Sequence, residues 1–170
     1  MHRVPVLGLA TAAVLFVLDQ LAKFFVTDVL RLDVLSAAQP ITWFFNLRFV
    51  PNIGISLSLL PADNEPMRWG LVALTAAIAA AVAVWMVRET SRPDRVALGL
   101  ILGGALGNIV DRVRFGYVVD FADLHFGEWR PFLVFNVADA AITIGVLVLL
   151  VRAFLTRDTR KPAPVESPHA

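Results

Sequence analysis

The sequence contains no cysteine among its 170 residues, which excludes disulfides, thiolate nucleophiles and cysteine-ligated metals and leaves the redox compartment open. Only 17% of the residues are charged and the formal net charge is +1, so no overall field attracts nucleic acid. The three histidines, His2, His125 and His169, lie far apart. We therefore expect no metal site, no cofactor and no nucleic-acid partner.

The chain is instead rich in apolar sequence. Hydrophobic residues make up 58% of it and the mean hydropathy is +0.71, whereas soluble domains have about 45–50% apolar residues. Four apolar runs can cross a hydrocarbon core of about 30 Å at about 1.5 Å per residue. They cover approximately residues 6–26, 67–87, 96–113 and 133–154. This pattern predicts an all-α integral membrane protein with one four-helix domain over residues 1–155 and a disordered polar tail at 156–170.

The loop between the first two spans, residues 27–66, is too structured for a simple linker. Residues 41–50 are rich in aromatic and β-branched side chains, residues 51–54 carry a turn signal, and residues 55–59 alternate in polarity. Two strands around a turn are predicted in this loop. The other long loop is residues 114–132.

Basic residues predict the orientation of the spans. The N-terminus, the connection at 88–95 and the tail share one side and are richer in arginine and lysine than their lengths suggest, although the longer loops also hold arginines. By the positive-inside rule, both termini face the cytoplasm. The two longer loops then face the periplasm or its equivalent.

In this topology, polar residues from three spans converge near the outer surface. Charged side chains in a bilayer core cost several kcal/mol, so they seldom occur without a function or a partner. The set comprises Asp19, Gln20 and Lys23 in the first span, Asn108, Asp111 and Arg112 in the third, and Asn136 and Asp139 in the fourth. Asp19 and Lys23 share one helix face, so they form an intrahelical ion pair, take part in a site, or both.

Two carboxylates at one depth support hydrolysis by an aspartic dyad. The ionised one activates water and the protonated one polarises the scissile carbonyl. Asp139 and Asp120, which lies just past the third span, are the best-placed pair, and Asp123 is expected to be a solvated loop residue. Two other hypotheses stay open: a small proton-coupled transporter that uses the same charges, and a scaffold whose polar residues only hold helices together.

Five motifs occur in order over all four spans and both outer loops. They are Asp19-Gln20-x-x-Lys23, Asn52-x-Gly54, Gly103-Gly104-Ala105-Leu106-Gly107-Asn108-x-x-Asp111-Arg112, Val119-Asp120-Phe121 and Phe135-Asn136-x-Ala138-Asp139. Together they resemble bacterial lipoprotein signal peptidase (signal peptidase II), a family of four-span aspartic peptidases. Its members cleave the signal peptide from prolipoproteins just before a diacylglyceryl-modified cysteine.

The resemblance implies that Asp120 and Asp139 are the catalytic dyad of an intramembrane aspartic endopeptidase. It also implies that the strands at 41–59 form a small extramembrane β-sheet, and that the site lies near the periplasmic face of the bacterial inner membrane. We expect a monomer that holds no cofactor or metal. Its partners would be lipid-modified prolipoproteins, membrane lipids and antibiotic inhibitors of the globomycin type. The residues implied to bind substrate or support the site are Asp19, Lys23, Asn52, Gly54, Asn108, Arg112 and Asn136.

The chain departs from the family in the first loop. Pro51 stands where arginine is usual, and residues 55–57 read Ile-Ser-Leu where Ala-Ala-Phe is usual. These differences concern the contacts of the first loop and leave the dyad motifs unchanged.

Overall fold

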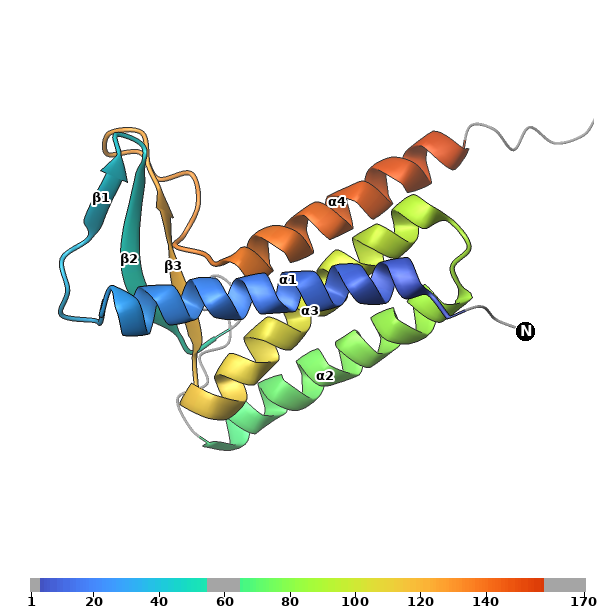
Figure 1. Cartoon of the computed structure of the whole chain (residues 1–170), viewed down its shortest axis with the longest axis horizontal. Coiled ribbons are helices and arrows are strands. Elements are labelled where there is room, and N and C mark those ends of the chain that lie inside the picture. The colour runs from blue at the N-terminus through green and yellow to red at the C-terminus, as the bar shows by residue number, and fades with distance from the viewer. Residues whose placement is uncertain (1–3, 55–64, 158–170) are drawn as a thin grey trace, which may run out of the picture.

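The computed structural model describes residues 4–54 and 65–157, which form a bundle of four long helices with a small sheet at one end (Figure 1). The helices are α1 (Val6–Phe24), α2 (Glu65–Arg88), α3 (Arg92–Phe115) and α4 (Val137–Arg157). All four are long and apolar enough to cross a membrane. α1 begins and α4 ends at the end of the bundle away from the sheet, as an even number of spans requires. The predicted tail lies, from residue 158 on, outside the described residues.

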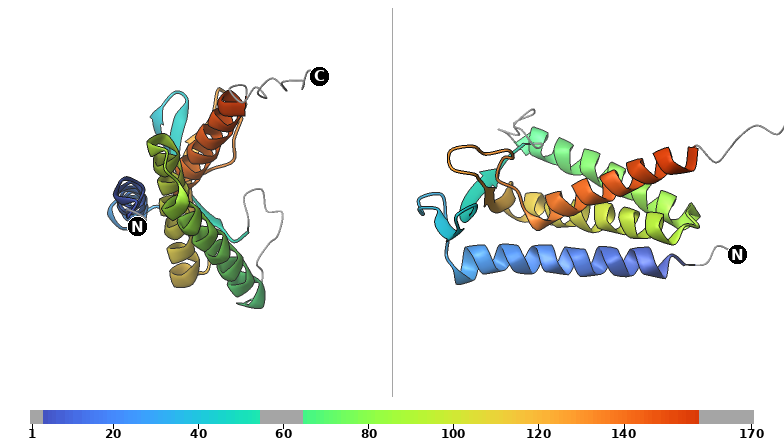
Figure 2. Two further views of the ribbon diagram at one scale, coloured as in Figure 1. Left: turned by 90° about the vertical axis from the view of Figure 1, so that its right-hand side faces the viewer. Right: turned by 90° about the horizontal axis from the view of Figure 1, so that it is seen from above.

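α3 is the central helix, and the other three each pack against it (Figure 2). Of the apolar stretch of α3, 56% is buried inside the protein, compared with 22%, 22% and 17% of those of α1, α2 and α4. Glycines allow this close packing. A Cβ at Gly103 would lie 2.5 Å from the carbonyl oxygen of Ala12 in α1, and one at Gly104 would lie 2.6 Å from that of Ala138 in α4. Small residues let membrane helices approach in this way.

The sheet has three antiparallel strands, and the first loop supplies two of them. In spatial order they are β1 (Gln39–Thr42), β2 (Phe45–Asn52) and β3 (Val118–Leu124). The predicted bounds of the first two are wrong, because the turn falls at Trp43 and Phe44 and not at 51–54. β2 continues through Asn52 since its last residues pair with β3. The strand predicted at 55–59 lies outside the described residues.

β3 comes from the second long loop and is the strand that the sequence did not predict. Its residues are buried from Val118 to Asp123, so the strand lacks the alternation that marks a strand with one face in water. The expectation that Asp123 is a solvated loop residue is wrong. This side chain is 1% exposed, and its Oδ1 accepts a hydrogen bond from Arg130 at 3.2 Å.

The fourth helix begins four residues later than the apolar run suggested. Residues 133–136 precede the helix, and Phe135 pairs with Ala122 of β3 through N–H···O bonds of 3.1 and 2.7 Å. Asn136 then caps α4, since its Oδ1 accepts the backbone N–H of Asp139 at 2.8 Å. The start of α4 is therefore tied directly to the sheet.

An apolar cluster holds the sheet against the end of α1. That helix ends in a π-helical turn, η1 (Phe25–Val29), which contributes the buried Val26. The cluster comprises Val26, Leu32, Val119, Phe121 and Ala122. It fixes β3 across the end of the bundle, beside the polar ends of α1 and α3.

Candidate active site

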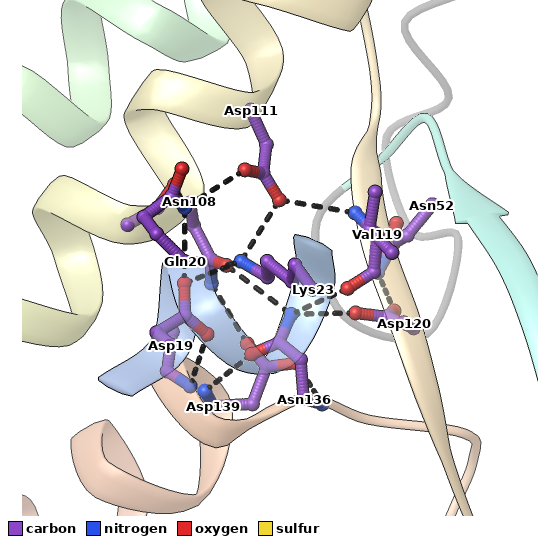
Figure 3. A network of polar contacts seen from close by, with 12 residues as sticks. Asp19, Gln20, Lys23, Asn52, Asn108, Asp111, Val119, Asp120, Asn136 and Asp139 are labelled. Atoms are coloured by element: carbon purple, nitrogen blue, oxygen red, sulfur yellow. Dashed lines mark hydrogen bonds and ion pairs between the residues drawn. The ribbon is translucent and has the colours of Figure 1, made fainter. Parts of the chain in front are cut away.

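Asp120 of β3 and Asp139 of α4 meet around the side chain of Asn136 (Figure 3). The Nδ2 of Asn136 donates to Asp120 Oδ1 at 2.7 Å, and its backbone N–H lies 3.4 Å from Asp139 Oδ2. Asp120 and Asn136 are 2% and 1% exposed, whereas Asp139 is half-buried. The structure thus brings the two predicted carboxylates into one polar network, in which Asp139 is the more exposed acid.

The loop after β2 contributes the second partner of Asp120. Asn52 Nδ2 donates to Asp120 Oδ2 at 2.9 Å, while Asn52 Oδ1 accepts the N–H of Gly54 at 3.1 Å. The carbonyl oxygen of Gly54 accepts from Arg112 Nη2 at 2.7 Å. Arg112 is 8% exposed, and in the described part of the chain its Nε has no hydrogen-bond partner. Asn52, Gly54 and Arg112 therefore lie together next to Asp120.

Asn108 of α3 connects Asp139 to Lys23. Its Oδ1 accepts from Lys23 Nζ at 3.1 Å and from Asn136 Nδ2 at 3.2 Å. Its Nδ2 donates to Asp139 Oδ1 at 2.9 Å. Because an ammonium group can only donate, Lys23 fixes which end of the Asn108 amide faces Asp139.

Lys23 also pairs with two buried carboxylates. Its Nζ lies 2.7 Å from Asp19 Oδ2 and 2.8 Å from Asp111 Oδ2. The expected intrahelical pair is confirmed, and the pair is also continuous with the site. Gln20 Nε2 donates to Asp111 Oδ1 at 3.0 Å. The sequence placed Asp111 and Gln20 at the right depth but gave them no role, because depth alone does not identify a partner.

Burial, together with the negative charge of Asp139, raises the pKa of Asp120 to about 7. Hydrogen bonds from Asn52 and Asn136 and the charge of Lys23 act in the opposite direction. A carboxyl group with a pKa near 7 is partly protonated at neutral pH, so Asp120 can hold or release a proton there. Among the described residues, no group of three or more His, Asp or Glu side chains is placed to hold a metal.

The raised pKa predicts a pH-dependent stability. Between the unfolded pKa of 3.8 and the folded value of about 7, the folded state binds more protons at Asp120. The contribution of Asp120 to stability is therefore fully present below the unfolded pKa and is lost as the pH rises through about 7. The Tm of the detergent-solubilised protein should fall from pH 5 to 8 more steeply than that of Asp120→Asn, and parallel curves would contradict this prediction.

The residues of this network all lie within the part of the chain that matches a known protein family. The model of the family described as Signal peptidase (SPase) II matches residues 11–155. A lipoprotein signal peptidase of Sphingopyxis alaskensis is 60% identical over 148 residues, which are 87% of this chain and 85% of that protein. One of Rhizorhabdus wittichii is 53% identical over 157 residues, 92% of this chain and 91% of that protein. A solved structure of a bacterial membrane enzyme, determined in meso at 2.3 Å resolution, has a TM-score of 0.79 with 25% identity and 94% coverage of both chains.

Proposed function

Since this chain belongs to the signal peptidase II family of lipoprotein signal peptidases, we propose that it cleaves diacylglyceryl-modified prolipoproteins just before the lipidated cysteine, with Asp120 and Asp139 as the catalytic dyad. Family membership makes it an aspartic peptidase and a multi-pass protein of the bacterial inner membrane that removes signal peptides from prolipoproteins. One observation carries the dyad: Asn136 bridges the two carboxyl groups in a largely buried network.

The proposed reaction is a water addition across the scissile amide. The ionised member of the dyad takes a proton from water, and the water oxygen attacks the carbonyl carbon while the protonated member donates a hydrogen bond to the carbonyl oxygen. The C–N bond then breaks, the leaving amine of the lipidated cysteine gains a proton, and the signal peptide keeps the new carboxylate. A pKa of about 7 at Asp120 supports this chemistry, because it lets the pair retain one proton at neutral pH.

We assign substrate binding to the polar groups on the Asp120 side of the site. Arg112 holds the carbonyl of Gly54 with Nη2, which places its guanidinium group beside Asp120 as a donor for a backbone carbonyl of the substrate. Asn52 orients Asp120. Pro51 departs from the usual arginine of the family, yet the adjacent Asn52 keeps its contact with Asp120, so this departure does not disturb the proposed dyad.

The proposed orientation places both termini in the cytoplasm and the site near the periplasmic face. The basic connection between α2 and α3 lies at the bundle end away from the sheet, where α1 begins and α4 ends (Figure 1). A substrate anchored by its acyl chains then meets the dyad while those chains stay in the lipid. We propose that the enzyme acts as a monomer, since Asn52, Asn108 and Asn136 of the same chain already supply side-chain donors to both acids.

A proton-coupled transporter fits the distribution of charge less well. A pathway for protons or ions needs polar groups along the spans. Within the described residues, the buried charged side chains of the spans all lie near the ends of α1 and α3 that adjoin the sheet. They are Asp19, Lys23, Asp111 and Arg112.

The direct test is cleavage of a purified prolipoprotein that carries the diacylglyceryl group, in detergent or proteoliposomes. We expect mass spectrometry to show a released signal peptide and a product that begins with the lipidated cysteine. The same precursor without the lipid should remain intact, and a globomycin-type inhibitor should block the reaction. Cleavage at another bond, or equal cleavage of both precursors, would contradict the proposal.

A further inference from the structure

A triad of buried charges adjoins the dyad, consisting of Lys23, Asp19 and Asp111 (Figure 3). The side chains of these residues are 5%, 0% and 1% exposed. Lys23 donates to both carboxylates and to Asn108, so its three N–H groups all have acceptors. The triad joins α1 to α3 at the depth of the dyad.

Both carboxylates of this Lys23 triad also accept a backbone N–H, and the two donors occupy matching positions. Asp19 Oδ1 accepts from Ala138 at 2.9 Å, immediately before Asp139. Asp111 Oδ2 accepts from Val119 at 3.1 Å, immediately before the other acid of the dyad. Each carboxylate thus links the ammonium group to the peptide that precedes one acid. The two acids lie on separate elements, a strand and a helix, so no regular hydrogen bonding within one element sets their separation.

Helix packing alone does not account for the triad. Replacing a buried ion pair by apolar residues of similar size is often neutral or stabilising, so buried charges are poor evidence for a purely stabilising role. Glycines already bring α1 against α3. What the charges add is an acceptor for the backbone N–H of Ala138 and another for that of Val119, which apolar packing does not supply.

We propose that the Lys23 triad is a positioning frame for the dyad. Asp19 and Asp111 each hold the peptide that precedes one acid of the dyad, and Lys23 fixes the distance between Asp19 and Asp111. This inference rests on the proposed function of Asp120 and Asp139. Because an error of about 1 Å in the placement of catalytic groups can cost about 10²-fold in rate, such a frame acts on kcat and not on substrate binding.

Gly107→Ala tests the frame without changing any charge. A Cβ at Gly107 would collide with Asp19 Oδ2 and push this carboxylate away from Lys23. We expect kcat to fall about 10²-fold with little change in KM. Gly103→Ala is the matched control, because its Cβ collides with the backbone of Ala12 in the same helix pair and touches no member of the triad. It should lower Tm at least as much while kcat stays near the wild-type value.

Lys23→Met supplies a second readout, the pH dependence of kcat. The charge of Lys23 lowers the pKa of Asp120, so its removal should move the ionisation of Asp120 to higher pH, which a purely structural role would not do. The charged groups around Asp120 are Asp19 and Lys23 from α1, Asp111 and Arg112 from α3, and Asp139 from α4.

The outcomes separate the frame from the dyad. Equal loss of kcat in Gly107→Ala and Gly103→Ala, or a wild-type kcat in Gly107→Ala, overturns the frame. So does a Lys23→Met enzyme with the wild-type pH profile. If Gly107→Ala and Lys23→Met both fail to fold while Gly103→Ala folds, the triad is a folding element and the frame is rejected. Activity retained in Asp120→Asn and Asp139→Asn instead rejects the proposed function itself.

Discussion

Asp120→Asn and Asp139→Asn are each expected to lower cleavage of the lipidated precursor by at least about 10³-fold. The reaction needs one carboxylate to accept a proton from water and one carboxyl group to donate to the carbonyl oxygen. An amide of the same shape cannot accept that proton at neutral pH. The remaining acid cannot be the ionised base and the protonated acid at the same time. Loss of either acid should therefore appear in kcat, with the affinity for the precursor retained.

The fold should tolerate both substitutions, although their local effects differ. Both oxygens of Asp120 accept from side-chain amides, those of Asn52 and Asn136. The Nδ2 group of an asparagine at this position would face one of these N–H donors and could not accept from it. Asp139 accepts from Asn108 at Oδ1, at 2.9 Å, and from the backbone N–H of Asn136 at Oδ2, at 3.4 Å. An asparagine there keeps the shorter bond through its amide oxygen and loses only the longer one. Asp139→Asn should accordingly keep a Tm closer to that of the wild type.

Asp123→Asn is the matched control for these variants. Asp123 lies in the same strand as Asp120 and is equally buried, but its partner is Arg130 and not a member of the site. It should leave kcat comparable to that of the wild type. The dyad assignment is wrong if Asp120→Asn or Asp139→Asn cleaves the precursor at the rate of Asp123→Asn.

The spans and the depth of the site could be predicted because a bilayer restricts sequence strongly. Apolar runs of sufficient length are unambiguous, and a carboxylate inside one, such as Asp139, stands out against its neighbours. The alternating direction of the spans then placed Asp19, Asn108 and Asp139 at one depth. The structure joins them in one network, through Lys23 and the backbone of Ala138.

The features that the sequence did not predict are those whose burial hides the usual alternation of polar and apolar residues. β3 is buried on both faces, so its apolar residues read as an extension of the neighbouring loop and Asp123 looked like a solvated residue. Residues 133–136 are apolar like the helix that follows, so the run did not reveal that α4 begins at Val137. The backbone N–H of Val119 carries no sequence signal, and its link to Asp111 emerges only when the strand is placed.

Asn136 lies where these features meet, and its position leads to the second large prediction. It ends the extended segment, caps α4 through Asp139 and donates to Asp120. Asn136→Asp should lower kcat about 10²- to 10³-fold at neutral pH, as loss of one essential hydrogen-bond donor does. The new carboxylate adds a negative charge beside the dyad, and it can no longer donate to Asp120.

Stability should separate the two roles of Asn136. Aspartate is as good an N-cap as asparagine, and its charge suits a helix N-terminus, so Asn136→Asp should keep α4 capped. Asn136→Ala removes both the cap, at about 1 kcal/mol, and the donor, and leaves buried polar groups without a partner at about 1–3 kcal/mol. We expect Asn136→Ala to lose both Tm and activity, and Asn136→Asp to lose mainly activity.

Acid pH should partly rescue Asn136→Asp but not Asn136→Ala. Protonation of the new carboxyl group restores an O–H donor toward Asp120, whereas alanine has none to restore. The measurement is kcat from pH 5 to 8 for both variants and the wild type. A wild-type rate for Asn136→Asp at neutral pH would mean that Asn136 serves α4 only as a cap. The two acids would then need no shared donor, and the bridge between strand and helix would be a consequence of the fold and not a part of the catalyst.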